Sequence, residues 1–184
     1  MRYLLGLLCL VILQSCFPVA IAPDLSNGSI KKAKKFNKKL PKRYSYIFTD
    51  PKAADEFYTY VNTKYDLKHN YVEDNVPVVL DGNNYYVSFY EVSKNTKTVN
   101  LLRPMANKIM EENGVPAIFN DDPVRDYGDT WYIALLISDE EFNDGLNPSY
   151  ANFARVEEFA SSLHKEYYSM RNYKQAILTV QKDK

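Results

Sequence analysis

Apolar residues recur at helical spacing toward the C-terminal end of the chain. Between Pro148 and Met170 they are separated by alternating steps of three and four residues, which places them on one side of a helix. This stripe consists of Phe153, Val156, Ala160, Leu163, Tyr167 and Met170. Asn147 and Pro148 are typical of a helix start, because Asn caps a free N–H and Pro suits the first helical position. The pattern predicts a long amphipathic helix that covers a sheet.

Alternating apolar and polar residues in the middle of the chain predict three strands. Val76 to Leu80 alternates, Asp81-Gly82-Asn83 is typical of a tight turn, and Tyr85 to Val92 alternates again. A second turn over Ser93 to Lys97 and a returning strand over Thr98 to Leu101 would complete an antiparallel three-stranded meander.

Other segments add helices and one further strand. Helical patterns cover about 51–65, after the cap-like Asp50-Pro51, and Pro104 to Gly114. Residues 115–129 look irregular, and Trp131 to Ile137 is apolar throughout, which predicts a central strand. Ala176 to Val180 is a last short strand or a turn. The fold class is therefore α+β: an antiparallel sheet covered by the long C-terminal helix and two shorter helices.

The first residues have the build of a secretory signal peptide. Arg2 precedes the apolar run Leu4 to Leu13, which is too short to span a bilayer. The run ends in Leu13-Gln14-Ser15-Cys16, which resembles the lipobox of bacterial lipoproteins. The resemblance implies removal of residues 1–15, attachment of fatty acid such as palmitate to Cys16, and anchoring to a lipid bilayer. Phe17 stands where many inner-membrane lipoproteins have Asp, which favours the outer membrane and a periplasm-facing body.

Two other interpretations of this segment stay open. Ala20-Ile21-Ala22 resembles an ordinary cleavage site, although Pro23 follows it directly. Alternatively, Leu4 to Ala22 is long enough to act as one membrane-spanning signal anchor.

The formal net charge of zero hides an uneven distribution of charge. Eight basic residues and no acidic residue lie between Leu25 and Thr49, whereas acidic residues exceed basic ones from Tyr44 onward. We therefore divide the chain into a basic linker over residues 16–43 and a single anionic domain over 44–184. The linker either is a solvated spacer or contacts an anionic membrane surface, and an exported segment with so few aromatics argues against nucleic-acid binding. The lysines expected at the membrane surface are Lys31, Lys32, Lys34, Lys35, Lys38 and Lys39.

The sequence offers few groups for catalysis. Cys9 and Cys16 are the only cysteines and both lie in the leader, so the body has no thiol for a disulfide, a metal or nucleophilic attack. His69 and His164 lack the spacing of a metal motif, and we interpret them as structural or surface residues. The acidic run from Asp139 to Asp144 does not fit a calcium-binding EF-hand loop. We therefore predict no catalytic residues, no metal site and no cofactor.

These observations favour an envelope-anchored lipoprotein whose body binds a partner without catalysing a reaction. Its anionic body would suit a basic protein. The alternative is a small cell-wall or glycan hydrolase in which Tyr85, Tyr86, Tyr90 and Trp131 form a sugar-stacking platform. The body also resembles uncharacterised small lipoproteins of the Bacteroidota, a group that implies no activity. That resemblance rests on Phe89-Tyr90-Glu91-Val92, Trp131-Tyr132-Ile133 and the Leu163-to-Tyr168 helix end.

Overall fold

The computed structural model describes residues 16–53, 55–100 and 124–170. The chain divides into two compact units. Unit 1 comprises residues up to Pro23 and Lys94–Thr130, and unit 2 comprises Asp24–Ser93 and the residues from Trp131 onward. The expected helix over 104–114 and the expected element over 176–180 fall outside the described residues.

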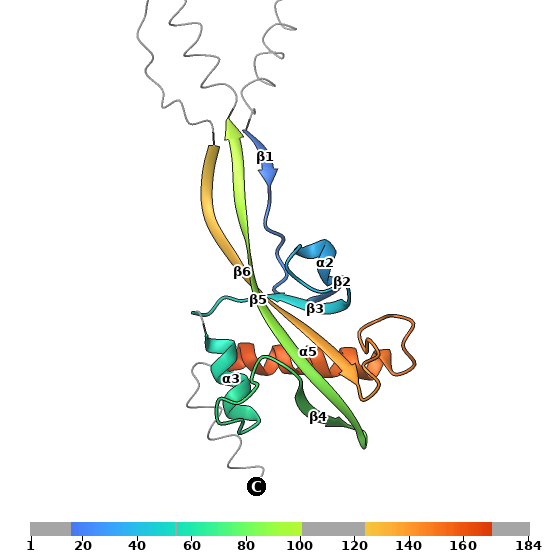
Figure 1. Cartoon of the computed structure of the whole chain (residues 1–184). Helices are drawn as coiled ribbons and strands as arrows, with labels where there is room; N and C mark the ends of the chain where they lie inside the picture. The colour runs from blue at the N-terminus through green and yellow to red at the C-terminus, as the bar shows by residue number, and fades with distance from the viewer. Residues whose placement is uncertain (1–15, 54, 101–123, 171–184) are drawn as a thin grey trace, which may run out of the picture. The chain divides into compact units, whose positions relative to one another are not determined.

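Six strands form one sheet whose described pairings are antiparallel, in the order β1-β5-β6-β3-β2 with β4 added to β5 (Figure 1). The strands are β1 (Cys16–Ala20), β2 (Ser29–Lys32), β3 (Tyr44–Thr49), β4 (Val76–Leu80), β5 (Asn83–Asn100) and β6 (Val124–Asp139). The described helices are α2 (Ala33–Phe36), α3 (Glu56–Lys64) and α5 (Phe153–Ser169). The predicted α+β class is confirmed.

The long C-terminal helix, α5, buries the predicted stripe in unit 2. Val156, Ala160, Leu163 and Tyr167 are buried, and Phe153 and Met170 at the two ends are half-buried. The helix begins at Phe153 rather than at Pro148, because the preceding residues form turns. The Asn147 side chain accepts a hydrogen bond from the N–H of Ser149, as in an Asx turn, instead of capping α5.

The β4–β5 hairpin is confirmed, but the predicted meander is not. Leu80 pairs with Asn83 across a two-residue turn in which Asp81 and Gly82 both have positive φ. The predicted turn over Ser93 to Lys97 is wrong, because β5 continues to Asn100 as one strand. The turn-forming residues of this segment do not end the strand, because residues 97–100 form backbone pairs with β1 and so extend β5.

The apolar run predicted as a central strand lies within β6, between β5 and β3. Both faces of this run are covered, so Tyr132 to Ile137 are all buried. Ile133, Leu135 and Ile137 belong to the main core with α3 and α5. Residues 124–129, expected to be irregular, are the beginning of this strand.

The segment from Asp24 to Arg43 is folded into unit 2, which differs from the linker expected over 16–43. β2 pairs with β3, and a single helical turn, α2, follows it. Four apolar residues of this segment are buried: Leu25, Ala33, Phe36 and Leu40. The Phe36 ring lies 5.1 Å from the Tyr132 ring, edge to face. These side chains cover the face of β6 opposite the main core, and this burial outweighs the repulsion among the lysines.

Helix α3 packs beside α5 in the main core. It begins at Glu56, so Asp50-Pro51 does not start it as predicted. The Phe57 ring lies 4.9 Å from the Tyr167 ring and 4.8 Å from the Phe89 ring. An ion pair between the half-buried Lys64 and Glu166 (2.6 Å) joins the two helices.

Candidate functional site

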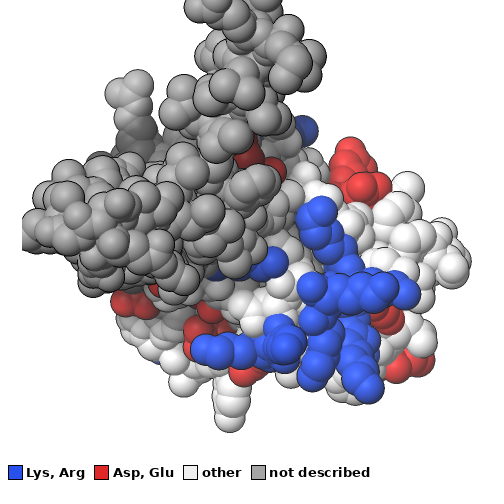
Figure 2. All heavy atoms as spheres, turned by 90° about the horizontal axis from the view of Figure 1, so that it is seen from above, with Lys and Arg blue, Asp and Glu red and all other residues white. Residues whose placement is uncertain are grey.

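Basic side chains gather on one face of unit 2. Figure 2 shows most of the visible Lys and Arg grouped in one large patch on the face seen from above, with acidic residues at its border. Eight basic residues lie between Lys31 and Arg43, which spans the end of β2, α2 and the loop before β3. We call this group the basic patch.

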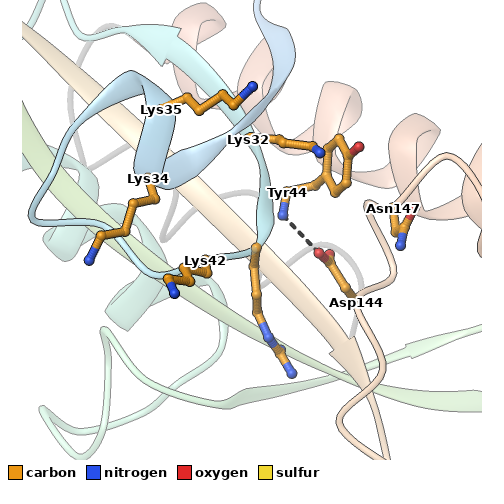
Figure 3. Close-up of a pocket in the computed structure, with 8 residues that line it drawn as sticks. Lys32, Lys34, Lys35, Lys42, Tyr44, Asp144 and Asn147 are labelled. Atoms are coloured by element: carbon orange, nitrogen blue, oxygen red, sulfur yellow. Dashed lines mark hydrogen bonds between the residues drawn. The ribbon is translucent and has the colours of Figure 1, made fainter.

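The basic patch surrounds a pocket of about 420 Å³. It is lined by Lys32, Lys34, Lys35, Lys42, Arg43, Tyr44, Asp144 and Asn147. Figure 3 shows that the lysines come from the α2 side, while Asp144 and Asn147 come from the loop between β6 and α5. We call this cavity the basic pocket. Its volume is within the range of cavities that hold small-molecule ligands.

The fold of α2 explains why the lysines face outward. Ala33 and Phe36 point into the structure and are buried, so the intervening Lys34 and Lys35 are exposed. The Ala33 N–H donates a hydrogen bond to the Arg43 carbonyl (2.8 Å), which holds α2 beside the start of β3. This bond brings Lys42 and Arg43 to the same cavity as Lys34 and Lys35.

The opposite wall is fixed by Asp144. Its Oδ2 accepts a hydrogen bond from the Tyr44 N–H (2.7 Å), drawn in Figure 3, and its Oδ1 accepts one from the Leu146 N–H (3.2 Å). Arg43 Nη2 donates a hydrogen bond to the Phe142 carbonyl in the same loop. The single carboxylate of the pocket is therefore occupied by backbone donors.

The pocket has an excess of positive charge. Five cationic side chains line it against one carboxylate. In the described part of the chain the ion pairs involve Lys64 and Arg155, and none includes a cation of the basic pocket. Lys32 Nζ lies 5.5 Å from the centre of the Tyr44 ring, a cation–π distance. Lys34, Lys35 and Lys42 are left to interact with solvent or with an anionic ligand.

Half of the lysines predicted at a membrane surface line this pocket. Lys32, Lys34 and Lys35 line it, whereas Lys31, Lys38 and Lys39 belong to the basic patch outside it. Sequence reasoning missed Lys42, Arg43 and Tyr44 as site residues, although Lys42 and Arg43 continue the same basic run. Nothing in the sequence indicated that Asp144 and Asn147 would line this pocket. They reach the lysines only because β3 pairs with β6.

The predicted lipidation segment lies at the edge of the described residues. The backbone of Cys16 begins β1 and pairs with Asn100 in unit 1, while Leu13, Gln14 and Ser15 fall outside the described residues. Among the residues that the structure describes, no helix is long and apolar enough to cross a membrane.

A second, smaller cavity of about 40 Å³ holds two carboxyl groups in unit 2. Asp50 and Glu91 line it together with Lys52 and the half-exposed Trp131. Burial raises the pKa of both carboxyl groups above their usual values, and burial lowers the pKa of Lys52. The Asp50 carboxylate accepts hydrogen bonds from Tyr167 Oη (2.9 Å) and the Lys52 N–H (3.0 Å). Both bonds oppose the rise in the pKa of Asp50.

The four aromatic residues expected to form a sugar platform do not share one environment. Tyr85 is buried, and Tyr86 stacks on Phe142 with ring centres 6.4 Å apart. Tyr90 and Trp131 are exposed.

The two histidines make aromatic contacts. His164 is 4% exposed and stacks on Phe48 with ring centres 4.2 Å apart. His69 is exposed and stacks on Tyr58. Burial lowers the pKa of His164 to about 4, with a smaller effect from Lys165.

The acidic loop after β6 is organised by hydrogen bonds. Both oxygens of Asp139 accept bonds from the side chain or backbone of Asn143, and Oδ2 also accepts one from the Tyr150 hydroxyl (3.0 Å). Within the described ranges, no group of three or more His, Cys, Asp or Glu residues is placed to hold a metal ion.

No protein-family model, curated protein or solved structure matches this chain.

Proposed function

We propose that this chain is an envelope lipoprotein, anchored through acylated Cys16, whose unit 2 binds an anionic ligand without catalysing a reaction. The envelope location is inferred from the lipobox-like Leu13-Gln14-Ser15-Cys16 and from the apolar run before it. The outer membrane, with the body facing the periplasm, is the preferred location.

The basic pocket is the observation that carries the binding role. Five cations surround a cavity of about 420 Å³, and its one carboxylate already accepts two backbone N–H groups. Unpaired cations at a concave surface attract anions and raise their local concentration. This geometry favours an anionic ligand over the basic protein partner expected from the acidic composition, and that partner stays a separate prediction.

The rest of the basic patch supports contact with an anionic membrane surface. Lys31, Lys38 and Lys39 lie outside the pocket in the same run as Lys34 and Lys35. Each lysine near an anionic bilayer contributes about 1 kcal/mol of attraction, which supplements an acyl anchor.

Metabolic labelling with a palmitate analogue tests the anchor. The wild-type chain should incorporate label and fractionate with membranes, and Cys16→Ala should lose both. An unlabelled wild-type chain whose mature form still begins at residue 1 would refute the lipoprotein assignment. The binding role has its own test, described below.

A second candidate, a small glycan hydrolase, rests on the Asp50 and Glu91 carboxyl groups beside the exposed Trp131. Glycoside hydrolases act through a pair of carboxyl groups, one of which has a raised pKa and serves as the general acid. The cavity that they line holds about 40 Å³, room for little more than water, so it would have to open to admit a sugar ring. Hydrolysis of purified cell wall by the wild type, lost in Glu91→Gln, would favour this candidate over the binding role.

A further inference from the structure

We propose that the basic pocket recognises a phosphate monoester carried on a headgroup-sized molecule. This inference rests on the proposed binding role and names its ligand. The ligand reaches the pocket either as a lipid headgroup at the bilayer surface or as a soluble sugar phosphate, and the two share one chemistry: a dianionic phosphoryl group on a polar carrier.

The pocket is rich in donors and poor in free acceptors. Each lysine ammonium carries three N–H donors, and Arg43 retains donors beyond the one that binds the Phe142 carbonyl. The Asn147 Oδ1 accepts a hydrogen bond from the Ser149 N–H (3.1 Å), so its side-chain NH₂ is the group left for a ligand. The carboxylate of Asp144 accepts from two backbone N–H groups. A ligand complementary to these hydrogen-bonding groups offers several oxygen acceptors and few donors.

The charge balance favours a dianion. Five cations against Asp144 leave an excess of four positive charges around the cavity. A phosphate monoester carries about −1.5 to −2 charge at neutral pH and three terminal oxygens, whereas a carboxylate or a phosphodiester carries one charge. Arg43 adds the planar geometry that phosphate groups accept in pairs of hydrogen bonds.

The pocket has room for more than inorganic phosphate. About 420 Å³ exceeds the volume of a phosphoryl group several-fold and suits a sugar or glycerol carrier as well. The half-buried Tyr44 ring supplies a flat wall for such a carrier. The Lys32 ammonium lies over this ring, 5.5 Å from its centre. Figure 3 shows the Tyr44 ring beside Lys32, whereas the Lys34 and Lys42 side chains point away from the ring.

Calorimetry on the full chain in a neutral detergent micelle tests the ligand class. The probes are glucose 6-phosphate, with glucose, gluconate and inorganic phosphate for comparison. We expect saturable one-to-one binding of glucose 6-phosphate and at least tenfold weaker binding of glucose and gluconate. Inorganic phosphate should bind more weakly than the sugar ester, because it leaves the Tyr44 wall empty.

Two matched triple variants separate the pocket from general surface charge. Lys34→Gln/Lys35→Gln/Lys42→Gln removes three pocket cations, and Lys31→Gln/Lys38→Gln/Lys39→Gln removes three cations of the same patch outside the pocket. The first should weaken glucose 6-phosphate binding at least tenfold and the second less than twofold. Absence of binding by the wild type, or equal loss in both variants, would overturn the proposal.

Chemical footprinting of lysines distinguishes the two sources of the ester. The full chain is placed in phosphatidylcholine bilayers containing either phosphatidic acid, a monoester lipid, or phosphatidylglycerol, a diester lipid. Selective protection of Lys34, Lys35 and Lys42 by phosphatidic acid assigns the ester to the bilayer, and protection only by glucose 6-phosphate assigns it to a soluble ligand. Protection by phosphatidylglycerol equal to that by phosphatidic acid would refute monoester recognition. The calorimetry does not depend on acylation of Cys16, so its failure is distinguishable from failure of the anchor.

Discussion

The hydroxyl oxygen of Tyr46 lies 3.2 Å from Nδ1 of His164, within the core that α5 forms with β3. On the other side of the histidine, Nε2 has no hydrogen-bond partner among the described residues. The ring is stacked on Phe48. A proton added to this imidazole would place a charge in a buried aromatic environment, and nearby Lys165 disfavours that charge further.

The fold should therefore lose stability in mild acid through His164. Its pKa in the folded chain is about 4, below the ordinary value of 6.5, so the unfolded chain binds more protons between these limits. The contribution is complete above pH 6.5 and is lost as the pH falls toward 4, up to about 3 kcal/mol. Urea unfolding at pH 7.5, 5.5 and 4, followed by fluorescence of the only tryptophan, Trp131, measures this loss.

His164→Phe keeps an aromatic ring and removes the titrating group, so its stability should vary less over the same pH range. His69→Gln, which alters the exposed histidine, controls for loss of an imidazole elsewhere. A His164→Phe variant that follows the wild-type pH dependence would contradict this account.

Gly28→Ala should destabilise unit 2 far more than Gly82→Ala. Both glycines have positive φ, but a Cβ on Gly28 would lie 2.2 Å from the Tyr46 hydroxyl, whereas one on Gly82 would meet nothing within 4 Å. We expect a loss of about 2–4 kcal/mol for Gly28→Ala, from left-handed strain plus overpacking, and about 1 kcal/mol for Gly82→Ala. Chemical unfolding of the two variants gives the comparison, and equal losses would mean that Tyr46 moves aside freely.

Lys52 should stabilise the C-terminal end of α5. Its ammonium donates hydrogen bonds to the carbonyls of Tyr167 (2.5 Å) and Met170 (2.7 Å) and lies 4.1 Å from the Tyr167 ring centre. A cation at a helix C-terminus also interacts favourably with the helix dipole. Lys52→Met should cost about 1–2 kcal/mol of unfolding free energy.

Lys165→Met is the control for Lys52→Met, because Lys165 is an exposed lysine of α5 itself. It should change stability by less than about 0.5 kcal/mol. Thermal unfolding monitored by circular dichroism compares the two, and a Lys52→Met variant as stable as the wild type would refute the capping role.

Asp144→Asn should strengthen anion binding at the basic pocket. The amide oxygen can still accept the Tyr44 N–H, while the one negative charge of the pocket is removed. We expect the dissociation constant for glucose 6-phosphate to fall by about two- to fivefold. Glu141→Gln, in the same loop but outside the pocket, should leave it unchanged. Weaker binding by a stably folded Asp144→Asn variant would show that Asp144 contacts the ligand directly.

The sequence predicted the elements whose pattern is set by one buried face. The stripe of α5 and the alternation of β4 follow from burial against a single core, and periodicity reports that directly. The Asp81-Gly82 turn was predictable because positive φ restricts the choice of residue. The class α+β followed from these elements.

Features that depend on distant pairing were missed. The turn expected over Ser93 to Lys97 is wrong because residues 97–100 of β5 pair with β1, about 80 residues earlier. The segment around Phe36 was expected to be a linker because its lysines dominate the local composition, yet its few apolar residues cover β6. The basic pocket was only half predicted for the same reason: its lysines are adjacent in sequence, but Asp144 is about 100 residues away.

The position of Cys16 at the first residue of β1 has a consequence for how a lipid would hold unit 1. A diacyl anchor on a flexible spacer lets a protein rotate and stand off from the bilayer, and proteases cut such spacers readily. Here the backbone of the candidate acylation site is already part of the sheet, where it pairs with Asn100. An acyl chain at Cys16 would therefore fix the orientation of unit 1 at the lipid surface, and shedding by proteolysis would require β1 to peel away first.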